Sequence, residues 1–308
     1  NLGGTKSEVI LGLAGLLFPL LCIFLVIKYL APSFNRKVAL MTSATSGDSE
    51  IKKGKPVGQK NYVSFWSRLL TNSKAEKGSF EFTWKMTARS RDFKLKVYPS
   101  IGYLLVYVVV VVLNNKRINL SELGQNETQS KVLIISALYF MSFLLTTAIS
   151  QMVYSDKFKA AWLFYTGPLH KPGEIVSGAA KAVVMKFYVP IVVLITTAGL
   201  LLSGAAVLPN IILGLFNQVL ISALRVYIGH KYFPFSMHQS NAVKTGAFLR
   251  GLGALFLSGL IAVGHYLLYS ILPAIILCAV LSIVATWLLF DAIKKTGWQQ
   301  IMSRYAEE

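Results

Sequence analysis

The sequence predicts an all-α, polytopic membrane protein. Three observations support this class: apolar stretches close to the roughly 20 residues that cross a bilayer as a helix, loops in which basic residues are alternately crowded and scarce, and no Asp or Glu inside any apolar stretch. We expect about seven transmembrane helices. They cover residues 9–27, 98–113, 132–153, 187–202, 208–226, 251–268 and 274–290.

Lys and Arg near the ends of these helices predict their orientation, because basic flanks are retained on the cytoplasmic side. Segments 28–96, 157–186, 225–250 and 294–304 hold 27 of the 31 basic residues. Every span then crosses from a basic-rich to a basic-poor side, with the C-terminus cytoplasmic and Asn1 outside. Because an outside start without a signal peptide is unusual, we expect an odd number of further spans before Asn1.

The spans divide the chain into six parts of alternating character. In chain order these are a first transmembrane helix (1–30), a basic cytoplasmic loop with interfacial helices (31–97), two transmembrane helices (98–153), cytoplasmic helices (154–186), four transmembrane helices (187–290) and a cytoplasmic tail (291–308).

The net charge of +18 lies mainly on the side that faces anionic cytoplasmic lipid. In the basic loop, residues 62–70 and 80–97 interleave aromatic side chains with Lys and Arg at helical spacing. A nucleic-acid patch can look similar, but the second segment directly precedes a transmembrane helix. We therefore expect helices in the headgroup layer, anionic membrane lipids as partners and no nucleic acid.

The loop after the third span predicts a stiff projection into the cytoplasm. Ser155 can cap a helix that runs to Phe164 and breaks at Gly167-Pro168. Pro172 then begins a second helix that leads into the fourth span. A helix, a tight break and another helix between two spans form a rigid element, and rigidity is what transmitting a push requires.

Three runs carry a resemblance to a known family: RSRDFKLKVYPSIGY (89–103), SDKFKAAWLFYTGPLHKPGEIVSGAAKAVVMKFYVP (155–190) and YFPFSMHQS (232–240). From about Phe80 to the C-terminus the chain resembles the permeases of ATP-binding cassette exporters whose ATPase is a separate polypeptide. The resemblance implies a permease half that dimerises and docks an ATPase dimer, with ATP and magnesium held by that partner and no cofactor in this chain. It implies no substrate. Such permeases carry more helices upstream, as the charge pattern also predicts.

If the projection is the coupling element, its exposed polar and aromatic residues should contact the ATPase. They are Asp156, Lys157, Lys159, Trp162, Lys171 and Glu174. Trp162 is the natural anchor, because large aromatic side chains dominate interface energies. The alternative is that Trp162, with Phe158 and Phe164, only rests in the headgroup layer.

Motifs for other energy sources and for catalysis are missing from the sequence. The only Gly-Lys pair, Gly54-Lys55, has Ser49 where a P-loop needs its first Gly and Pro56 where it needs a hydroxyl. The spans lack the carboxylates that ion-coupled carriers commonly use. Neither His-Glu-x-x-His nor Gly-x-Ser-x-Gly occurs, so we expect no enzyme. A secondary carrier or channel is the main alternative, and a lipid enzyme is less favoured.

Two features of the sixth predicted span, residues 251–268, are candidate sites. Ala254, Ser258 and Ala262 recur every four residues and form a small-residue stripe that permits close helix packing, within one subunit or between two. His265 lies near the outer end of the span. We interpret it as a hydrogen-bonded residue between helices and, as the alternative, as part of a substrate or proton pathway.

Overall fold

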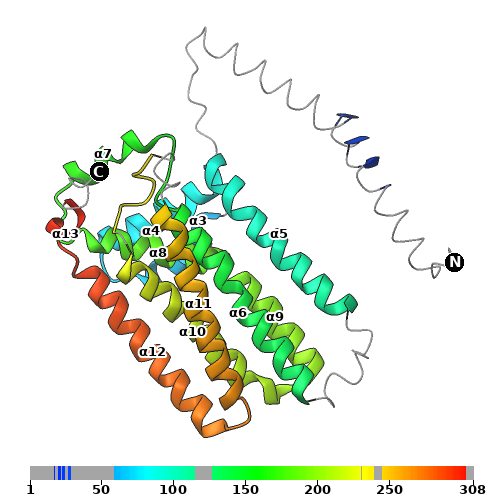
Figure 1. The fold of residues 1–308 in the computed structure, drawn as a ribbon. Coiled ribbons are helices and arrows are strands. Elements are labelled where there is room, and N and C mark those ends of the chain that lie inside the picture. Colours follow the sequence, from blue (N-terminus) through cyan, green and yellow to red (C-terminus); the bar gives the residue numbers. More distant parts are fainter. Residues whose placement is uncertain are drawn as a thin grey trace. The chain divides into compact units, whose positions relative to one another are not determined.

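A computed structural model describes residues Leu17, Leu20, Leu21, Ile23, Phe24, Ile27 and Lys28 and the ranges 59–114, 127–229, 231–238 and 245–302. The chain divides into two units, Asn1–Val57 and Gly58–Glu308, and the second is described here. Within its described ranges every regular element is a helix, and one isolated bridge joins Tyr154 and Met237 (Figure 1).

In chain order the helices are α3 (Gln59–Leu70), α4 (Lys74–Arg89), α5 (Arg91–Asn114), α6 (Glu127–Gln151), η3 (Phe158–Ala161), α7 (Trp162–Thr166), α8 (Gly173–Phe187), α9 (Val189–Ser203), η4 (Ala205–Val207), α10 (Leu208–Ile228), α11 (Thr245–Leu268), α12 (Leu272–Lys294) and α13 (Trp298–Met302). Among the described residues, five helical stretches are long and apolar enough to cross a membrane: Lys131–Gln151, Gly173–Thr197, Ala205–Ile228, Gly251–Leu268 and Leu272–Lys294. The chain is therefore a multi-pass membrane protein.

Four of the predicted spans coincide with α6, α10, α11 and α12. The stretch 98–113 lies within α5, and the first predicted span, 9–27, lies largely outside the described residues. The fourth span differs from the prediction, because the apolar helical stretch begins at Gly173 rather than near residue 187. It contains α8 and α9, which meet at Tyr188, and Pro190 lies in the first turn of α9.

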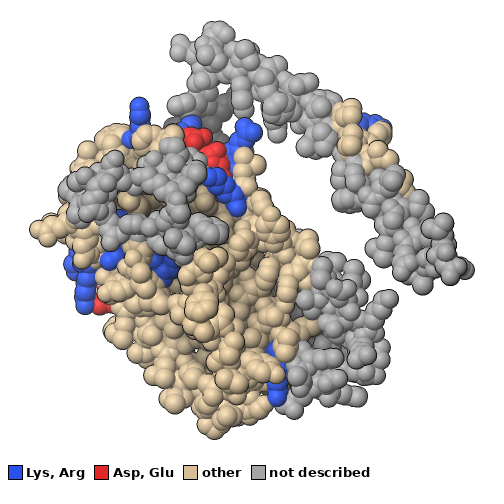
Figure 2. All heavy atoms as spheres, viewed as in Figure 1, with Lys and Arg blue, Asp and Glu red and all other residues tan. Residues whose placement is uncertain are grey.

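Helices α6, α10, α11 and α12 form the main bundle of the second unit. α10 packs against both α6 and α12, and α11 packs on α6 (Figure 1). Figure 2 shows that the charged side chains visible on this face gather mainly at the end where α3, α4 and α7 lie, and that most of the surface over the bundle is uncharged. This division is typical of a protein whose helices stand in lipid with one end in water.

Helix α4 packs along α8 at the charged end. A Cβ at Gly178 of α8 would lie 2.2 Å from the main-chain oxygen of Glu76, so only a glycine permits this approach. Of the aromatic residues expected in the headgroup layer, Phe80 and Phe93 are fully buried in protein, whereas Tyr62 and Phe65 are exposed. The amphipathic pattern of this region therefore arises because one face packs into the protein core and the other face is exposed.

Candidate functional site

The loop between α6 and α8, residues 154–172, is held firmly at its start, and we call it the projection. Its first residues run beside the segment that follows α10. Three backbone hydrogen bonds join the two: Phe235 N to Met152 O (2.8 Å), Met237 N to Val153 O (3.0 Å) and Ser155 N to Met237 O (2.9 Å). Two loops far apart in the sequence are thereby fixed to one another.

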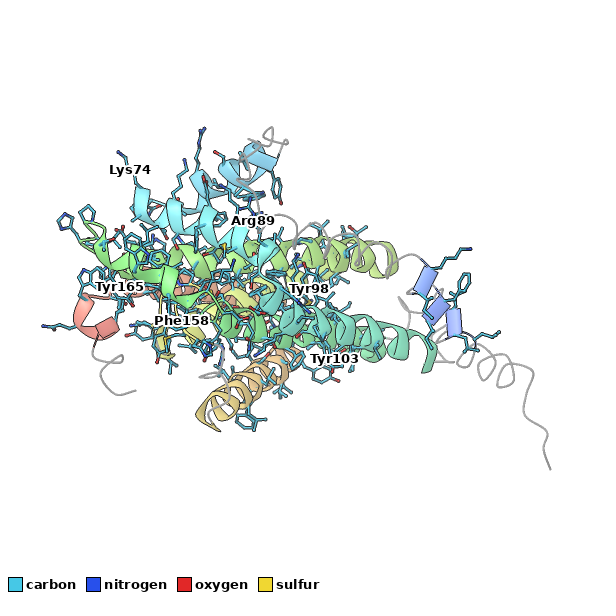
Figure 3. The ribbon with its side chains drawn as sticks, turned by 90° about the horizontal axis from the view of Figure 1, so that it is seen from above. Lys74, Arg89, Tyr98, Tyr103, Phe158 and Tyr165 are labelled. Atoms are coloured by element: carbon cyan, nitrogen blue, oxygen red, sulfur yellow. The ribbon has the colours of Figure 1, made fainter. Side chains whose placement is uncertain are left out.

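Aromatic side chains fill the space beneath the projection. The rings of Phe164 and Tyr165 each lie 5.2 Å from the ring of Phe233, and Trp298 of α13 lies 5.8 Å from Phe233. The indole of Trp298 donates a hydrogen bond to the carbonyl of Leu169 at 2.9 Å. The projection therefore rests on a packed aromatic cluster that the segment after α10 and helix α13 supply (Figure 3, which labels Phe158 and Tyr165).

The end of the projection meets the end of α12. The amide of Gly173 donates to the carbonyl of Thr296 at 3.2 Å, and a Cβ at Gly173 would lie 2.1 Å from the carbonyl oxygen of Ile293. Any other residue at position 173 would push α8 and α12 apart. The end of the projection is thus in direct contact with the end of α12 at the point where α8 begins.

The helix predicted from Lys157 to Phe164 is not continuous. A 3₁₀ turn, Phe158–Ala161, leads into the five-residue α7. Ser155 does not cap a helix, since its hydroxyl accepts from the amide of Lys157 in a tight turn (3.1 Å). The predicted break is correct, because α7 ends at Thr166 and Gly167 has extended backbone.

The six residues expected to contact an ATPase are not equivalent in the structure. Five are exposed: Asp156, Lys157, Lys159, Trp162 and Lys171. The sixth, Glu174, is half-buried and accepts a hydrogen bond from the hydroxyl of Ser73 at 2.6 Å. It belongs to the contact between α4 and α8 rather than to the free surface.

Trp162 and Leu163 form the apolar tip of the projection, each 63% exposed. The other aromatic residues of the segment are occupied: Phe164 lies in the cluster, and Phe158 packs edge-on against His238 with ring centroids 5.2 Å apart. Leu163 was missed by the sequence analysis, because a single Leu in an aromatic run carries no signal. The exposed tip is therefore small and well defined.

A buried carboxylate joins the three helices behind the projection. Glu76, only 1% exposed, accepts hydrogen bonds from Lys181 Nζ (2.7 Å), Ser177 Oγ (2.8 Å) and the amide of Asn72 (2.9 Å), and Lys294 Nζ lies 3.3 Å away. Burial by itself would raise the pKa of Glu76, but the hydrogen bonds and the charge of Lys181 outweigh it and hold that pKa below its usual value. No sequence pattern pointed to this centre, because Glu76 lies between the two amphipathic segments, 62–70 and 80–97.

Helix α4 also supplies hydrogen-bond acceptors to both lysines of the apolar stretch that begins at Gly173. Besides its bond to Glu76, Lys181 donates to the carbonyl of Leu70 at 2.6 Å. Lys186 donates to the carbonyl of Trp84 (2.7 Å) and to the hydroxyl of Thr87 (2.6 Å). α4 thus satisfies two cations that the stretch would otherwise carry into an apolar environment.

Within the bundle, a chain of buried polar side chains links α6, α10, α11 and α12. His265, 3% exposed, contacts the hydroxyl of Tyr139 and the amide oxygen of Asn210, each at 3.2 Å. Asn217 donates to Tyr139 at 2.7 Å and accepts from Ser282 at 2.6 Å. This placement matches the interpretation of His265 as a hydrogen-bonded residue between helices. The sequence did not reveal its partners Tyr139 and Asn210, nor Asn217, which bonds to Tyr139.

The small-residue stripe of α11 faces its own subunit at its centre. Ser258 is buried, and its hydroxyl lies in hydrogen-bonding contact with that of Ser142 on α6. Ser142 also donates to Gln218 of α10 at 2.6 Å. Ala262 packs against the apolar core between α6 and α10, and Ala254 is half-buried. Close packing of α6 and α11 is therefore the contact that the stripe makes in this structure.

Among the described residues, no group of three or more His, Cys, Asp or Glu is placed to hold a metal ion. Comparisons of the chain with protein-family models, curated proteins and solved structures gave no match. The fold and the site together define a class, a multi-pass α-helical membrane protein with an anchored projection at the charged end of its bundle.

Proposed function

We propose that this chain is the permease subunit of an ATP-binding cassette exporter, moving its substrate with ATP that a separate ATPase polypeptide hydrolyses. It would lie in the cytoplasmic membrane with its C-terminus inside and pair with a second permease subunit. The proposal rests on the sequence resemblance given above and on one structural observation. That observation is a rigidly anchored loop which presents an exposed Trp–Leu tip among charged residues.

The anchoring favours docking over simple contact with lipid. A segment that only rests in the headgroup layer needs an apolar face, but no fixed geometry. The projection instead has its backbone bonded to a second loop, its aromatic residues packed on Phe233, and its tip flanked by Lys157 and Lys159. Exposed aromatic and aliphatic side chains with a charged rim are the arrangement found at protein interfaces.

The elements behind the tip supply a path for force. The projection ends at Gly173, which contacts the last turn of α12 and begins α8. Glu76 then joins α8 to α4 and to Lys294 of α12. A partner that moves the projection would thereby move helices that enter the bundle, which is what coupling ATP hydrolysis to transport requires.

The test is Trp162→Ala in the full chain, isolated from its native membrane with its partners. Loss of a central aromatic anchor should weaken ATPase binding by about 2 kcal/mol, roughly 30-fold, because such residues dominate interface energies. The measurement is the amount of ATPase subunit, identified by its P-loop peptide, that co-purifies. Trp287→Ala is the matched control, since Trp287 is 67% exposed and belongs to α12 rather than to the projection.

If Trp162→Ala retains the ATPase and its hydrolysis still responds to the permease, the docking assignment is wrong. The buried hydrogen-bond network around His265 favours the second candidate, a secondary carrier, because polar residues between spans often form transport pathways. A carrier needs no ATPase. Isolation of the unaltered chain without any P-loop protein would therefore support the carrier and exclude the permease.

A further inference from the structure

A groove of about 600 Å³ lies between α5, α6 and α11, and it shares only Tyr139 and Ser258 with the sites described above. Its walls are almost wholly apolar and largely aromatic. Tyr103 and Tyr107 line it from α5, Phe140 and Phe143 from α6, and Leu255 and Gly259 from α11. The volume falls within the range of roughly 300–1,000 Å³ that small-molecule sites occupy.

The walls of the groove are held in place rather than loosely arranged. The ring of Tyr107 stacks on that of Phe140 with centroids 4.5 Å apart and planes 10° apart, and Tyr103 meets Phe143 edge-on at 6.1 Å. Ser258, at the bottom, is fixed by its contact with Ser142. The groove is therefore a preformed site.

The groove faces the surroundings of the bundle. Tyr103 is 58% exposed at its rim, and Val106 is 60% exposed beside it. On α11, the neighbouring Phe256 and Leu260 are 70% and 55% exposed. Because α6 and α11 are both candidate membrane spans, these residues meet lipid acyl chains, and a chain entering the groove never has to leave an apolar medium.

A cation stands on the same face of α5 as the groove. Lys96 is exposed and precedes Tyr103 by seven residues, two turns of helix, so the two side chains point in the same direction about 10 Å apart. Figure 3 labels Tyr103 on α5 and Arg89 at the end of α4, just before α5 begins. By the charge pattern, Lys96 lies at the cytoplasmic boundary, where phosphate headgroups are found.

We propose that this groove binds one acyl chain of an anionic phospholipid, with Lys96 contacting its phosphate. The apolar volume accounts for the chain, the lateral opening for entry from the bilayer, and the cation two turns away for the preference for a negative headgroup. The site does not depend on an ATPase partner. It assigns a ligand to a part of the chain that the proposed docking function does not use.

The test uses the full chain in nanodiscs of phosphatidylcholine containing a small fraction of phosphatidylglycerol with a photoactivatable diazirine midway along one chain. After illumination, adducts are mapped by peptide mass spectrometry. They should be about tenfold denser on the groove-lining residues of α5, α6 and α11 than on the exposed residues Leu277, Leu281, Val284 and Leu288 of α12, because a bound acyl chain resides longer than a bulk one. Equal density would overturn the proposal, as would groove residues free of adducts.

Two variants on one helix sharpen the test. Among the described atoms, none lies within 4 Å of a Cβ placed at Gly259 or at Gly253, so both positions accept a larger side chain. Gly259→Phe fills the groove and should lower its adducts about fivefold, since the ring takes the volume that the acyl chain needs. Gly253→Phe does not line the groove and should leave them unchanged. An equal loss in both variants would contradict a defined site.

The headgroup contact is tested without altering the groove. In Lys96→Gln, phosphatidylglycerol and phosphatidylcholine probes with the same diazirine chain should label the groove equally, whereas the unaltered chain should favour phosphatidylglycerol about threefold, as expected for one cation at the lipid surface. An unchanged preference in Lys96→Gln would show that another group selects the lipid.

Discussion

Glu76 is the residue on which most of the charged end depends. It is nearly inaccessible to water, yet it accepts three hydrogen bonds and faces two lysines from two different helices. Breaking a buried pair by removing one partner is far more costly than the net value of the pair, because the remaining charge is left without compensation. The four atoms that surround this carboxylate therefore set the relative positions of α4, α8 and α12.

The first residue-scale prediction concerns Glu76→Gln. The substitution leaves Lys181 and Lys294, whose side chains are 15% and 19% exposed, without their counter-charge. We expect a loss of about 3 kcal/mol in the free energy of unfolding, measured as a lowered Tm of the chain in detergent. Asp156→Asn is the control, because Asp156 is exposed on the projection. Equal Tm values for the two variants would contradict the role assigned to Glu76.

The difference in Tm between the unaltered chain and Glu76→Gln should also depend on pH, and the sign of this dependence follows from the lowered pKa of Glu76. A carboxyl with a folded-state pKa below its ordinary 4.5 stabilises the fold above that value and loses its contribution as the pH falls through the folded pKa. The difference in Tm between the unaltered chain and Glu76→Gln should therefore be constant at neutral pH and shrink below pH 4.5. A difference that persists unchanged at lower pH would exclude an ionised Glu76.

At the scale of the element, the apolar face of α4 is buried against α8, which the amphipathic pattern alone did not reveal. Hydropathy and basic flanks predicted the spans, and Gly167-Pro168 predicted the end of α7, because these signals are local. Three of the four partners of Glu76, namely Ser177, Lys181 and Lys294, lie more than 100 residues further along the chain and leave no local trace. Asn210 and Asn217 are likewise single polar residues in apolar runs, and only the packed bundle shows that both belong to one chain of hydrogen bonds with Tyr139 and His265.

The element-scale prediction compares two glycines on adjoining helices. Gly178→Ala should lower the Tm, because its Cβ would lie 2.2 Å from the Glu76 carbonyl and must separate α4 from α8, an overpacking cost of about 1–3 kcal/mol. Gly78→Ala on α4 meets none of the described atoms within 4 Å and should raise stability by about 0.5–1 kcal/mol through helix propensity. If the Tm changes in the same direction in both variants, the contact between α4 and α8 can adjust to a side chain at position 178.

At the scale of the whole molecule, the basic-rich segments predict which side of the membrane is cytoplasmic. In the structure, the charged side chains visible in Figure 2 gather mainly at one end of the bundle. Within the second unit, the projection, the buried Glu76 centre and the aromatic cluster all lie at the charged end. The groove and the hydrogen-bond network around His265 lie among the apolar helices. Such a division requires that the projection and the turn between α11 and α12 face opposite sides of the membrane.

This topology is tested by labelling intact cells with an impermeant thiol reagent, after Cys22 and Cys278 are replaced by alanine. Thr166→Cys, exposed at the end of α7, should react only once the membrane is permeabilised, and Ser270→Cys, exposed between α11 and α12, should react at once. The basic residues that flank the projection give the physical reason. If Thr166→Cys reacts in intact cells, the orientation in the membrane is the reverse of the one predicted here.

The bonds between α4 and the two lysines of α8 bear on the order in which the protein is made. A lysine in an apolar stretch opposes its own entry into the bilayer, so Lys181 and Lys186 are obstacles to insertion of the segment that contains them. Synthesis proceeds from the N-terminus, and α4, with Glu76, Trp84 and Thr87, leaves the ribosome before α8 does. Glu76, Trp84 and Thr87 are thus synthesised before the lysines that they bind, so pairing with α4 would lower the cost of placing α8 in the bilayer.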